Sequence, residues 1–245
     1  MTVKDFILSG TKKGTMHMTL LDPDKQTPEE AAAIALHCKN AGTDAIMIGG
    51  STGITTENVD ATAVAIKEAT GLPTIYFPAG PHALSTKCDA IYFMSMINST
   101  DVKWVMGAQI YASSIIKKIG IESISMGYII VEPGMKVGEV GKAKLIKRDD
   151  IPGAIGAALG AQMLGMSLVY LEAGSGADVP VSPEMIRAVK NELEVPLIIG
   201  GGINTPEKAS AAREAGADII VTGTFIENCR DDNTLKSVIA AAKGL

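Results

Sequence analysis

The chain has 245 residues, 47% of them hydrophobic and 20% charged, so it can bury one large core and we expect a single domain over residues 1–245. A net charge of −5 without a run of like charges excludes nucleic acid and an anionic membrane surface as main partners, while leaving room for a pocket that binds a small anion. Cys38, Cys88 and Cys229 lie far apart, with no CxxC spacing and no signal peptide before them, which predicts a reduced, cytoplasmic protein.

Apolar runs alternate with helix signals along the chain. Thr27, Pro28 and Glu30 form a capping box that opens a helix, and a similar Ser/Thr-Pro opening recurs at Ser182 and Thr205. Further helices are predicted over 56–70, 101–119 and 152–164. Strands are predicted over 16–21, 45–48, 73–77, 90–94, 127–131, 167–172, 197–199 and 218–221.

The uncharged stretch from 151 to 171 is long enough to cross a bilayer. Pro152 and Gln162 interrupt it, however, and alanine and glycine make it only mildly apolar. We therefore divide it into a helix over 152–164 and a buried strand over 167–172. No transmembrane segment is expected.

Eight strands alternating with helices predict a closed parallel barrel, the (β/α)8 or TIM-barrel fold. The runs 46–48 and 219–221 are apolar at every position, as expected for strands covered on both faces. The unit at 41–49, a helix stop followed by an acidic strand start, an apolar strand and a glycine, recurs at 215–223. In such a barrel the carboxyl ends of all strands meet at the face where ligands bind.

Three glycine-rich turns follow the last three predicted strands. They are Gly174-Ser175-Gly176, Gly200-Gly201-Gly202 and Gly223-Thr224. Glycine lets the backbone approach a ligand closely and turn its N–H groups toward an anion. Because this is the layout of a barrel's phosphate site, we interpret the three turns as one phosphate-binding cup.

Glu172 ends the sixth strand directly before the cup. A carboxylate repels phosphate, so Glu172 is expected to contact hydroxyl groups further along the ligand. We therefore infer a small polyol phosphate as the ligand. The alternative for Glu172 is a surface salt bridge at a strand end.

Asp22 ends the first strand in the turn Asp22-Pro23-Asp24-Lys25. Mg²⁺ usually takes one or two carboxylates and completes its shell with water and phosphate oxygens, so an acidic strand end near Ser51 suits a metal–diphosphate pair. The alternative is a plain strand-to-helix turn with an aspartate cap.

Six motifs together carry a resemblance to a known family. They are Leu21 to Lys25, Gly49 to Ser51, Asn98-Ser99, Tyr170 to Ala177, Gly200 to Ile203 and Gly223-Thr224. They resemble the motif set of geranylgeranylglyceryl phosphate synthase, the archaeal ether-lipid prenyltransferase, from about Lys12 to the end of the chain. The resemblance implies a barrel that joins sn-glycerol 1-phosphate to geranylgeranyl diphosphate and releases diphosphate with Mg²⁺, an early step of membrane phospholipid biosynthesis.

The resemblance also assigns roles to residues. Asp22 and Ser51 would bind Mg²⁺, and Lys25 is expected to help to neutralise the leaving diphosphate. Glu172 would orient the glycerol and accept the proton of its attacking hydroxyl, so that Glu172 and Asp22 are the catalytic residues. The residues expected to bind glycerol phosphate are Tyr170, Leu171, Glu172, Ala173, Gly174, Ser175, Gly176, Gly201, Gly202, Gly223 and Thr224. Related bacterial heptaprenyl enzymes have a lysine where this chain has Leu20, which favours the archaeal type.

Other functions of a barrel with this cup stay open on the residues alone. A phosphoribosyl isomerase shares the late-strand cup but usually needs a second phosphate loop, for which 77–80 is a poor candidate. An aldolase would need a Schiff-base lysine where the sixth strand has Glu172. A non-catalytic phospholigand-binding barrel would bind the same anion without releasing diphosphate.

A homo-oligomer is expected. Trp104 and the small residues Gly156 and Gly160 are candidate contact surfaces, with packing inside one chain as the alternative. The length of the prenyl chain depends on the depth of a channel whose floor residues the sequence does not identify.

Overall fold

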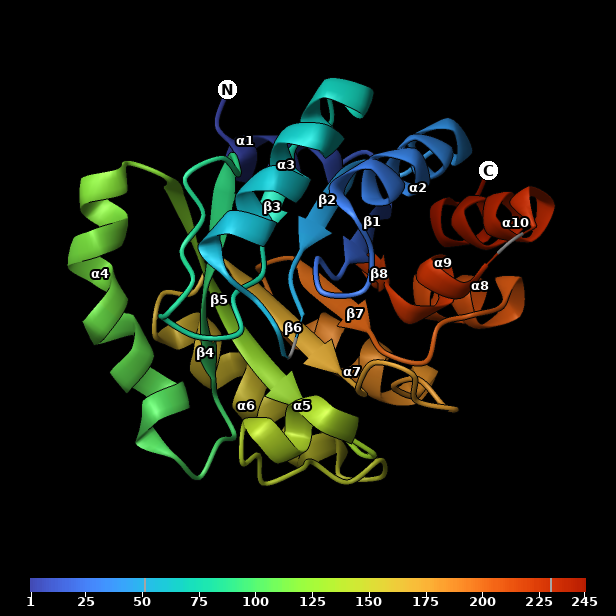
Figure 1. The fold of residues 1–245 in the computed structure, drawn as a ribbon. Coiled ribbons are helices and arrows are strands. Elements are labelled where there is room, and N and C mark those ends of the chain that lie inside the picture. The colour runs from blue at the N-terminus through green and yellow to red at the C-terminus, as the bar shows by residue number, and fades with distance from the viewer. Residues whose placement is uncertain (51, 230) are drawn as a thin grey trace.

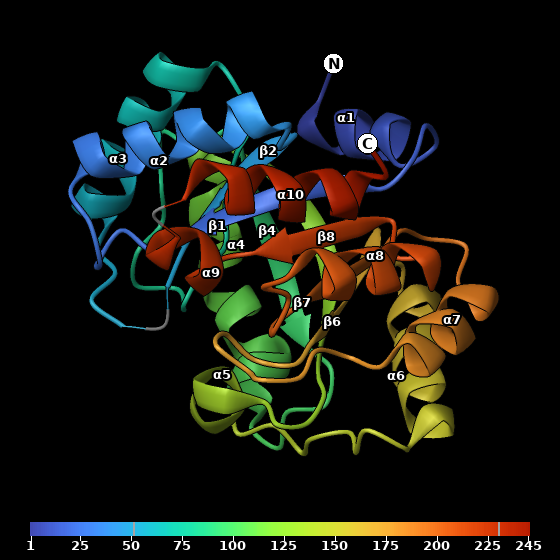
Figure 2. The same ribbon diagram turned by 90° about the vertical axis from the view of Figure 1, so that its right-hand side faces the viewer.

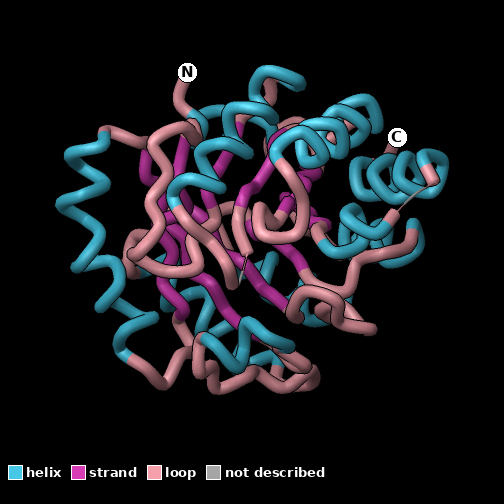
Figure 3. The backbone as a smooth tube through the Cα atoms, viewed as in Figure 1, coloured by secondary structure: helices cyan, strands magenta, loops and turns pink. Residues whose placement is uncertain are grey.

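The computed structural model describes residues 1–50, 52–229 and 231–245. Within them, eight parallel strands close into a barrel in the order of the sequence, and β8 pairs with β1. The strands are β1 (Met16–Leu21), β2 (Ala45–Ile48), β3 (Thr74–Tyr76), β4 (Ala90–Met96), β5 (Glu122–Ile130), β6 (Leu168–Glu172), β7 (Leu197–Gly200) and β8 (Ile219–Thr222). Figure 3 shows the strands inside a layer of helices. The predicted TIM-barrel fold is confirmed.

Helices connect successive strands and cover the outside of the barrel (Figure 1). In the described ranges they are α1 (Val3–Gly10), α2 (Pro28–Ala41), α3 (Thr56–Thr70), the π-helical turn η1 (Lys103–Gly107), α4 (Ala108–Ile119), α5 (Met135–Val140), α6 (Ile151–Met163), α7 (Pro183–Glu192), α8 (Pro206–Glu214), α9 (Thr224–Asn228) and α10 (Asp232–Lys243). Figure 2 shows α10 lying across β1 beside α8, so the last helix covers the first strand.

Three helices begin where the sequence predicts, and for the predicted reason. The side chains of Thr27, Ser182 and Thr205 each accept a hydrogen bond from the backbone N–H three residues further on. These bonds satisfy N–H groups that the helix itself leaves without a partner. The helices α2, α7 and α8 therefore start at fixed points after their strands.

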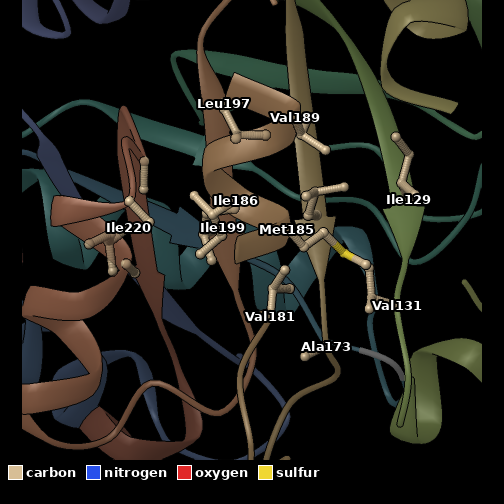
Figure 4. Close-up of a cluster of buried hydrophobic side chains, with 14 of the residues drawn as sticks. Ile129, Val131, Ala173, Val181, Met185, Ile186, Val189, Leu197, Ile199 and Ile220 are labelled. Carbon is tan, nitrogen blue, oxygen red and sulfur yellow. The ribbon is translucent and has the colours of Figure 1, made fainter. Parts of the chain in front are cut away.

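Side chains alternate between the inside and the outside of the barrel. Met18, Met47, Met126 and Leu168 belong to the cluster that fills the interior, and each is at most 1% exposed. The alternate residues of β5, β6 and β7 point outward against α6 and α7, in a second cluster drawn in Figure 4. A third cluster joins the outer faces of β1, β2 and β3 to α2, α3 and α4. The strands are thus covered on both faces, as their unbroken apolar sequences predict.

Four helices, α1, α5, α9 and α10, and the first residues of β5 were not foreseen. The strand β5 begins at Glu122, before the predicted start at 127. The prediction missed its first residues because they alternate polar and apolar and are partly exposed. Helix α1 packs Val3 and Ile7 against the barrel interior, and its backbone N–H groups at Val3 and Lys4 donate to the Glu122 carboxylate over 2.6 and 2.9 Å. Helix α5 is only six residues long. The predicted helix over 101–119 begins instead with the π-helical turn η1.

The uncharged stretch from 151 to 171 divides as expected. Helix α6 takes its first part and β6 its last, with Gly165 between them in a left-handed conformation at φ +83°. Among the described residues, no helix is long and apolar enough to span a membrane.

Candidate active site

Two cavities open at the carboxyl ends of the strands. The first has a volume of about 420 Å³ and lies at the ends of β6, β7 and β8. The second has a volume of about 430 Å³ and lies over the ends of β1 to β5. The residues that line both are Leu20, Glu172, Ser175, Gly223 and Thr224. The two cavities are therefore adjacent, and we call them the cup cavity and the central cavity.

The cup cavity is built from the predicted glycine turns. Gly201 and Gly202 have left-handed φ angles of +82° and +74°. A Cβ on Gly201 would collide with Glu172 Oε1, and one on Gly202 would lie 2.9 Å from the carbonyl oxygen of Ala177. No lysine or arginine is found among the described lining residues, so an anion here must be held by backbone N–H and hydroxyl groups.

Other predicted residues meet at the same place. Ser175 and Thr224 join the β6 and β8 turns through a short hydrogen bond between their hydroxyls. Gly176, Gly223 and Tyr170 also line the cup cavity. The structure thus brings the three predicted turns together.

Three predicted contacts are placed differently. Leu171 and Ala173 are fully buried, with side chains in the outer cluster against α6 and α7, and neither residue lines the cup cavity or the central cavity. Gly174 donates its N–H to the Glu172 carboxylate. A role for these three residues in binding glycerol phosphate stays a prediction.

Glu172 is a buried carboxylate between the two cavities, with 7% of its surface exposed. Its Oε1 accepts a hydrogen bond of 2.6 Å from the Gly174 N–H, and the hydroxyls of Tyr170 and Tyr128 also donate to the carboxylate. Burial raises the pKa of Glu172, while these three hydrogen bonds oppose the rise. The arrangement provides an oriented proton acceptor at the boundary of the cavities. The surface salt bridge considered as an alternative is absent from the ion pairs of the described residues.

An aromatic cluster supports Glu172 from inside the barrel. The ring centroids of Tyr128 and Tyr170 are 5.2 Å apart, and those of Phe77 and Tyr128 are 5.4 Å apart, both pairs packed edge to face. Sequence reasoning did not identify Phe77 or Tyr128. Tyr128 lies two residues from Met126 and from Ile130 on β5, so all three share the face that points into the barrel. This spacing does not show which residue Tyr128 contacts across the barrel.

Asp22 and Lys25 lie at the far side of the central cavity, beside Glu227 of α9. Lys25 Nζ is 2.7 Å from Glu227 Oε2 and 3.7 Å from Asp22 Oδ2. Burial raises the pKa of Asp22, the hydrogen bond from the Asp24 backbone N–H and the Lys25 ammonium oppose this rise, and the negative charges of Glu227 and Asp24 add to it. The other predicted metal ligand, Ser51, lies outside the described residues.

The residues around Asp22 fit a Mg²⁺ ion that takes most of its coordinating oxygens from water and a bound phosphate group. The described residues contain no group of three His, Cys, Asp or Glu side chains that would form a complete protein cage. Mg²⁺ normally keeps waters and phosphate oxygens and takes few carboxylates, so one aspartate at the cavity wall suffices.

An apolar pocket continues the central cavity. It lies between β4 and α4, and it shares Pro78, Met94, Met96, Trp104 and Tyr128 with the central cavity. Ile91, Leu84, Ala112 and Ile116 complete its apolar wall. Cup cavity, central cavity and apolar pocket thus follow one another as a channel, polar at one end and apolar at the other.

The chain is similar to known proteins over most of its length. The sequence profile of the PcrB family matches residues 10–242. The geranylgeranylglyceryl phosphate synthase of Thermoplasma acidophilum is 49% identical over 227 residues, which cover 93% of this chain and 90% of that protein. The protein of the same name from Thermococcus kodakarensis is 51% identical over 225 residues, or 92% and 89%.

A solved structure is similar over the whole chain. The crystal structure of (S)-3-O-geranylgeranylglyceryl phosphate synthase from Thermoplasma acidophilum, in complex with its substrate sn-glycerol-1-phosphate, has a TM-score of 0.97 at 46% identity and covers 100% of both chains. The resemblance found in the sequence motifs is confirmed. This chain therefore belongs to the PcrB family, together with these geranylgeranylglyceryl phosphate synthases.

Proposed function

We infer that this chain is a prenyltransferase that joins sn-glycerol 1-phosphate to geranylgeranyl diphosphate and releases diphosphate, a step of archaeal ether-lipid synthesis. Membership of the family supports this, as does the similar structure with bound sn-glycerol-1-phosphate. The observation that carries it is the place of Glu172, a buried carboxylate where a glycine cup meets a channel that becomes apolar.

The cup cavity receives the phosphate of the glycerol substrate. Backbone N–H groups of the glycine turns, with the hydroxyls of Ser175 and Thr224, stabilise its charge by hydrogen bonding. Glu172 lies at the edge of the cup toward the central cavity, so a glycerol hydroxyl faces its carboxylate. Tyr170 and Tyr128 hold that carboxylate in place through their hydroxyls.

The transfer exchanges one carbon–oxygen bond for another. The bond between the first prenyl carbon and diphosphate breaks, and diphosphate leaves with the electron pair. The glycerol hydroxyl oxygen forms the new ether bond to that carbon, and its proton passes to Glu172. The raised pKa of Glu172 makes its carboxylate a stronger base than an exposed glutamate.

The central cavity holds the diphosphate, with Asp22 as a Mg²⁺ ligand and Lys25 as a further positive charge. A bound Mg²⁺ would neutralise charge on the leaving diphosphate. The partly buried Asp22 carboxylate at the cavity wall supports this assignment. Ser51 stays a predicted second ligand.

The prenyl chain lies along the central cavity, of about 430 Å³, and only part of it enters the apolar pocket, whose volume is about 60 Å³. At about 0.8 kcal/mol for each buried CH₂, a chain of twenty carbons contributes on the order of 10 kcal/mol gross. Met94, Met96 and Trp104 line the passage into the pocket and provide an apolar, polarisable surface beside a developing carbocation. This anchoring needs no membrane-spanning helix.

A homo-oligomer in the cytoplasm is the working form that we propose. Exposed apolar side chains along η1 and α4 support an interface between copies, with Met106, Ile110 and Tyr111 at 51%, 69% and 65% exposure. The free thiols of Cys38, Cys88 and Cys229 suit a reducing compartment. Analytical ultracentrifugation of the protein and of Ile110→Asp tests the interface, since a lone monomer in both would reject it.

A turnover assay tests the function. Both enantiomers of glycerol phosphate are crossed with prenyl diphosphates of about ten to twenty-five carbons, and released diphosphate and ether product are measured. We expect selective product from sn-glycerol 1-phosphate and the twenty-carbon diphosphate. Binding of glycerol phosphate without diphosphate release would instead indicate a phospholigand-binding barrel, and ring-opening of a phosphoribosyl substrate would indicate an isomerase.

A further inference from the structure

Glu227 is a largely buried carboxylate to which sequence reasoning gave no role. It lies on α9, which begins at Thr224 directly after the cup residue Gly223, and 7% of its side chain is exposed. Its Oε1 accepts a hydrogen bond of 2.9 Å from the Asp22 backbone N–H. Its Oε2 accepts one of 2.7 Å from Lys25 Nζ. One side chain thus binds both ends of the Asp22 turn.

The position of Lys25 follows from these contacts. Its ammonium group is 2.7 Å from Glu227 Oε2, within hydrogen-bond distance, but 3.7 Å from Asp22 Oδ2. Without the charge on Glu227, Asp22 would be the carboxylate left beside this ammonium. An ion pair between Lys25 and Asp22 would then compete with a divalent cation for the same oxygens.

We propose that Glu227 is a positioning residue that holds the Lys25 ammonium away from Asp22 and fixes the Asp22 backbone, so that the Asp22 carboxylate is available to a divalent cation. The proposal rests on the proposed function, in which Asp22 binds Mg²⁺ beside diphosphate. Glu227 itself needs no contact with the substrate. Because α9 continues from the cup, Glu227 also fixes the distance between the phosphate cup and the Asp22 turn.

The test separates the charge of Glu227 from its shape. Glu227→Gln keeps an amide oxygen for the Asp22 N–H but presents no negative charge to Lys25. Inorganic diphosphate is titrated by calorimetry into the full-length protein over a series of Mg²⁺ concentrations, and the Mg²⁺ concentration for half-maximal binding is recorded. The same Mg²⁺ requirement is measured in the turnover assay, with KM for glycerol phosphate as a second value.

A double-mutant cycle with Lys25→Met gives the decisive comparison. With Lys25 present, Glu227→Gln should raise the Mg²⁺ requirement about tenfold, within the range for residues that support a metal ligand. In the Lys25→Met background the same substitution should have little effect, since no ammonium is left to turn to Asp22. KM for glycerol phosphate should stay within about twofold throughout. Glu214→Gln, which removes a carboxylate from an exposed pair with Arg213 on α8, is the matched control.

Each outcome decides the matter. An unchanged Mg²⁺ requirement in Glu227→Gln overturns the proposal and leaves the prenyl transfer of the wild-type chain untouched. An equal rise with and without Lys25 shows that Glu227 acts on the fold rather than through Lys25, and also overturns it. If the wild-type protein binds diphosphate equally well at every Mg²⁺ concentration, both the proposal for Glu227 and the assignment of Asp22 as a metal ligand are wrong. Absence of prenyl transfer in the wild type rejects the proposed function instead.

Discussion

Glu172 has an environment that favours catalysis over stability. Burial opposes its charge, and the Gly174 N–H with the Tyr128 and Tyr170 hydroxyls offset only part of that cost, so its pKa is raised in the folded protein. Such a side chain is retained where its proton affinity is useful. Removing its charge should therefore lower turnover and raise the stability of the folded protein.

Glu172→Gln keeps the size of the side chain but removes the proton acceptor. We expect turnover to fall by roughly 10²–10⁴-fold, the usual value of general-base catalysis, while binding of glycerol phosphate weakens little. Single-turnover rates with saturating glycerol phosphate measure the effect. A rate within a few-fold of wild type would mean that Glu172 only positions the substrate and that water or another group takes the proton.

The same variant should be more stable than wild type at neutral pH. A carboxyl group whose folded pKa is raised stabilises the folded state below its unfolded pKa, and this stability is lost as pH rises through the folded value. Glutamine has no such loss, so the Tm of Glu172→Gln should exceed that of wild type at about pH 7. The difference should shrink on acidification and vanish below the ordinary glutamate pKa. A Tm difference that does not change with pH would point to packing instead.

Asp22 should matter for the metal rather than for the fold. Asp22→Asn removes an anionic ligand from the wall of the central cavity and changes little packing. We expect the Mg²⁺ requirement of turnover to rise by more than about 100-fold, because outer-shell partners alone are worth about 10–100-fold. The thermal unfolding midpoint is the control. Identical Mg²⁺ titrations for variant and wild type would refute the assignment.

At the scale of elements, the turns after β6, β7 and β8 form one unit. Gly202 of the β7 turn packs against Ala177 and Pro180 of the β6 turn, and the Arg148 guanidinium donates to the carbonyl of Pro180 over 2.8 Å. Lys208 of α8 donates to the carbonyl of Asp178. The cup is therefore supported by side chains that do not face it.

Gly202→Ala tests how closely these turns must approach. The new Cβ would lie 2.9 Å from the carbonyl oxygen of Ala177, so the β6 turn must shift. KM for glycerol phosphate should rise at least about tenfold, while KM for the prenyl diphosphate changes little. Gly71→Ala is the matched control, because Gly71 has a similar φ of +65° but nothing within 4 Å of a Cβ. Equal rises in both KM values would indicate a general loss of structure.

The sequence predicts much of this framework. The bounds of β1 and β2 agree with the prediction, because their apolar runs are unbroken and are flanked by clear turn residues. The cup and Glu172 were also identified, since both lie in one continuous stretch or directly after a strand. These are local signals, which a single sequence displays.

The parts that were missed depend on contacts across the fold. Tyr128 reaches Glu172 because β5 pairs with β6 in a register that places Tyr128 opposite Tyr170. Glu227 reaches Asp22 because closure of the barrel joins β8 to β1. The local sequence shows neither the register of β5 against β6 nor the pairing of β8 with β1. Tyr128 and Glu227 therefore looked like ordinary core or surface positions.

At the scale of the whole molecule, the channel divides recognition between two ends. In the proposed function the cup recognises a small anion through backbone groups, the pocket by α4 recognises apolar length, and the transfer takes place between them, at Glu172. Changes at one end should therefore leave recognition at the other end intact.

Ala112→Phe tests this separation by filling the apolar pocket. Ala112 is 5% exposed and lines the pocket from α4. A ring that displaces about two methylenes of the prenyl chain should raise KM for the twenty-carbon diphosphate about tenfold. A ten-carbon diphosphate and glycerol phosphate should be affected far less. Ser237→Phe adds the same ring at an exposed position of α10 that lines none of these cavities, and a similar loss there would argue against the pocket.

Trp104 gives this channel an optical label. It is the single tryptophan of the sequence, it lines both the central cavity and the apolar pocket, and the Lys103 ammonium lies 4.5 Å from its ring centroid. Fluorescence excited at the red edge of tryptophan absorption therefore comes from the lipid end of the channel alone. If the proposed sites are right, a prenyl chain that excludes water there shifts the emission to the blue, whereas glycerol phosphate in the cup leaves it unchanged. The order in which the two substrates arrive is thus open to stopped-flow fluorescence without any added dye.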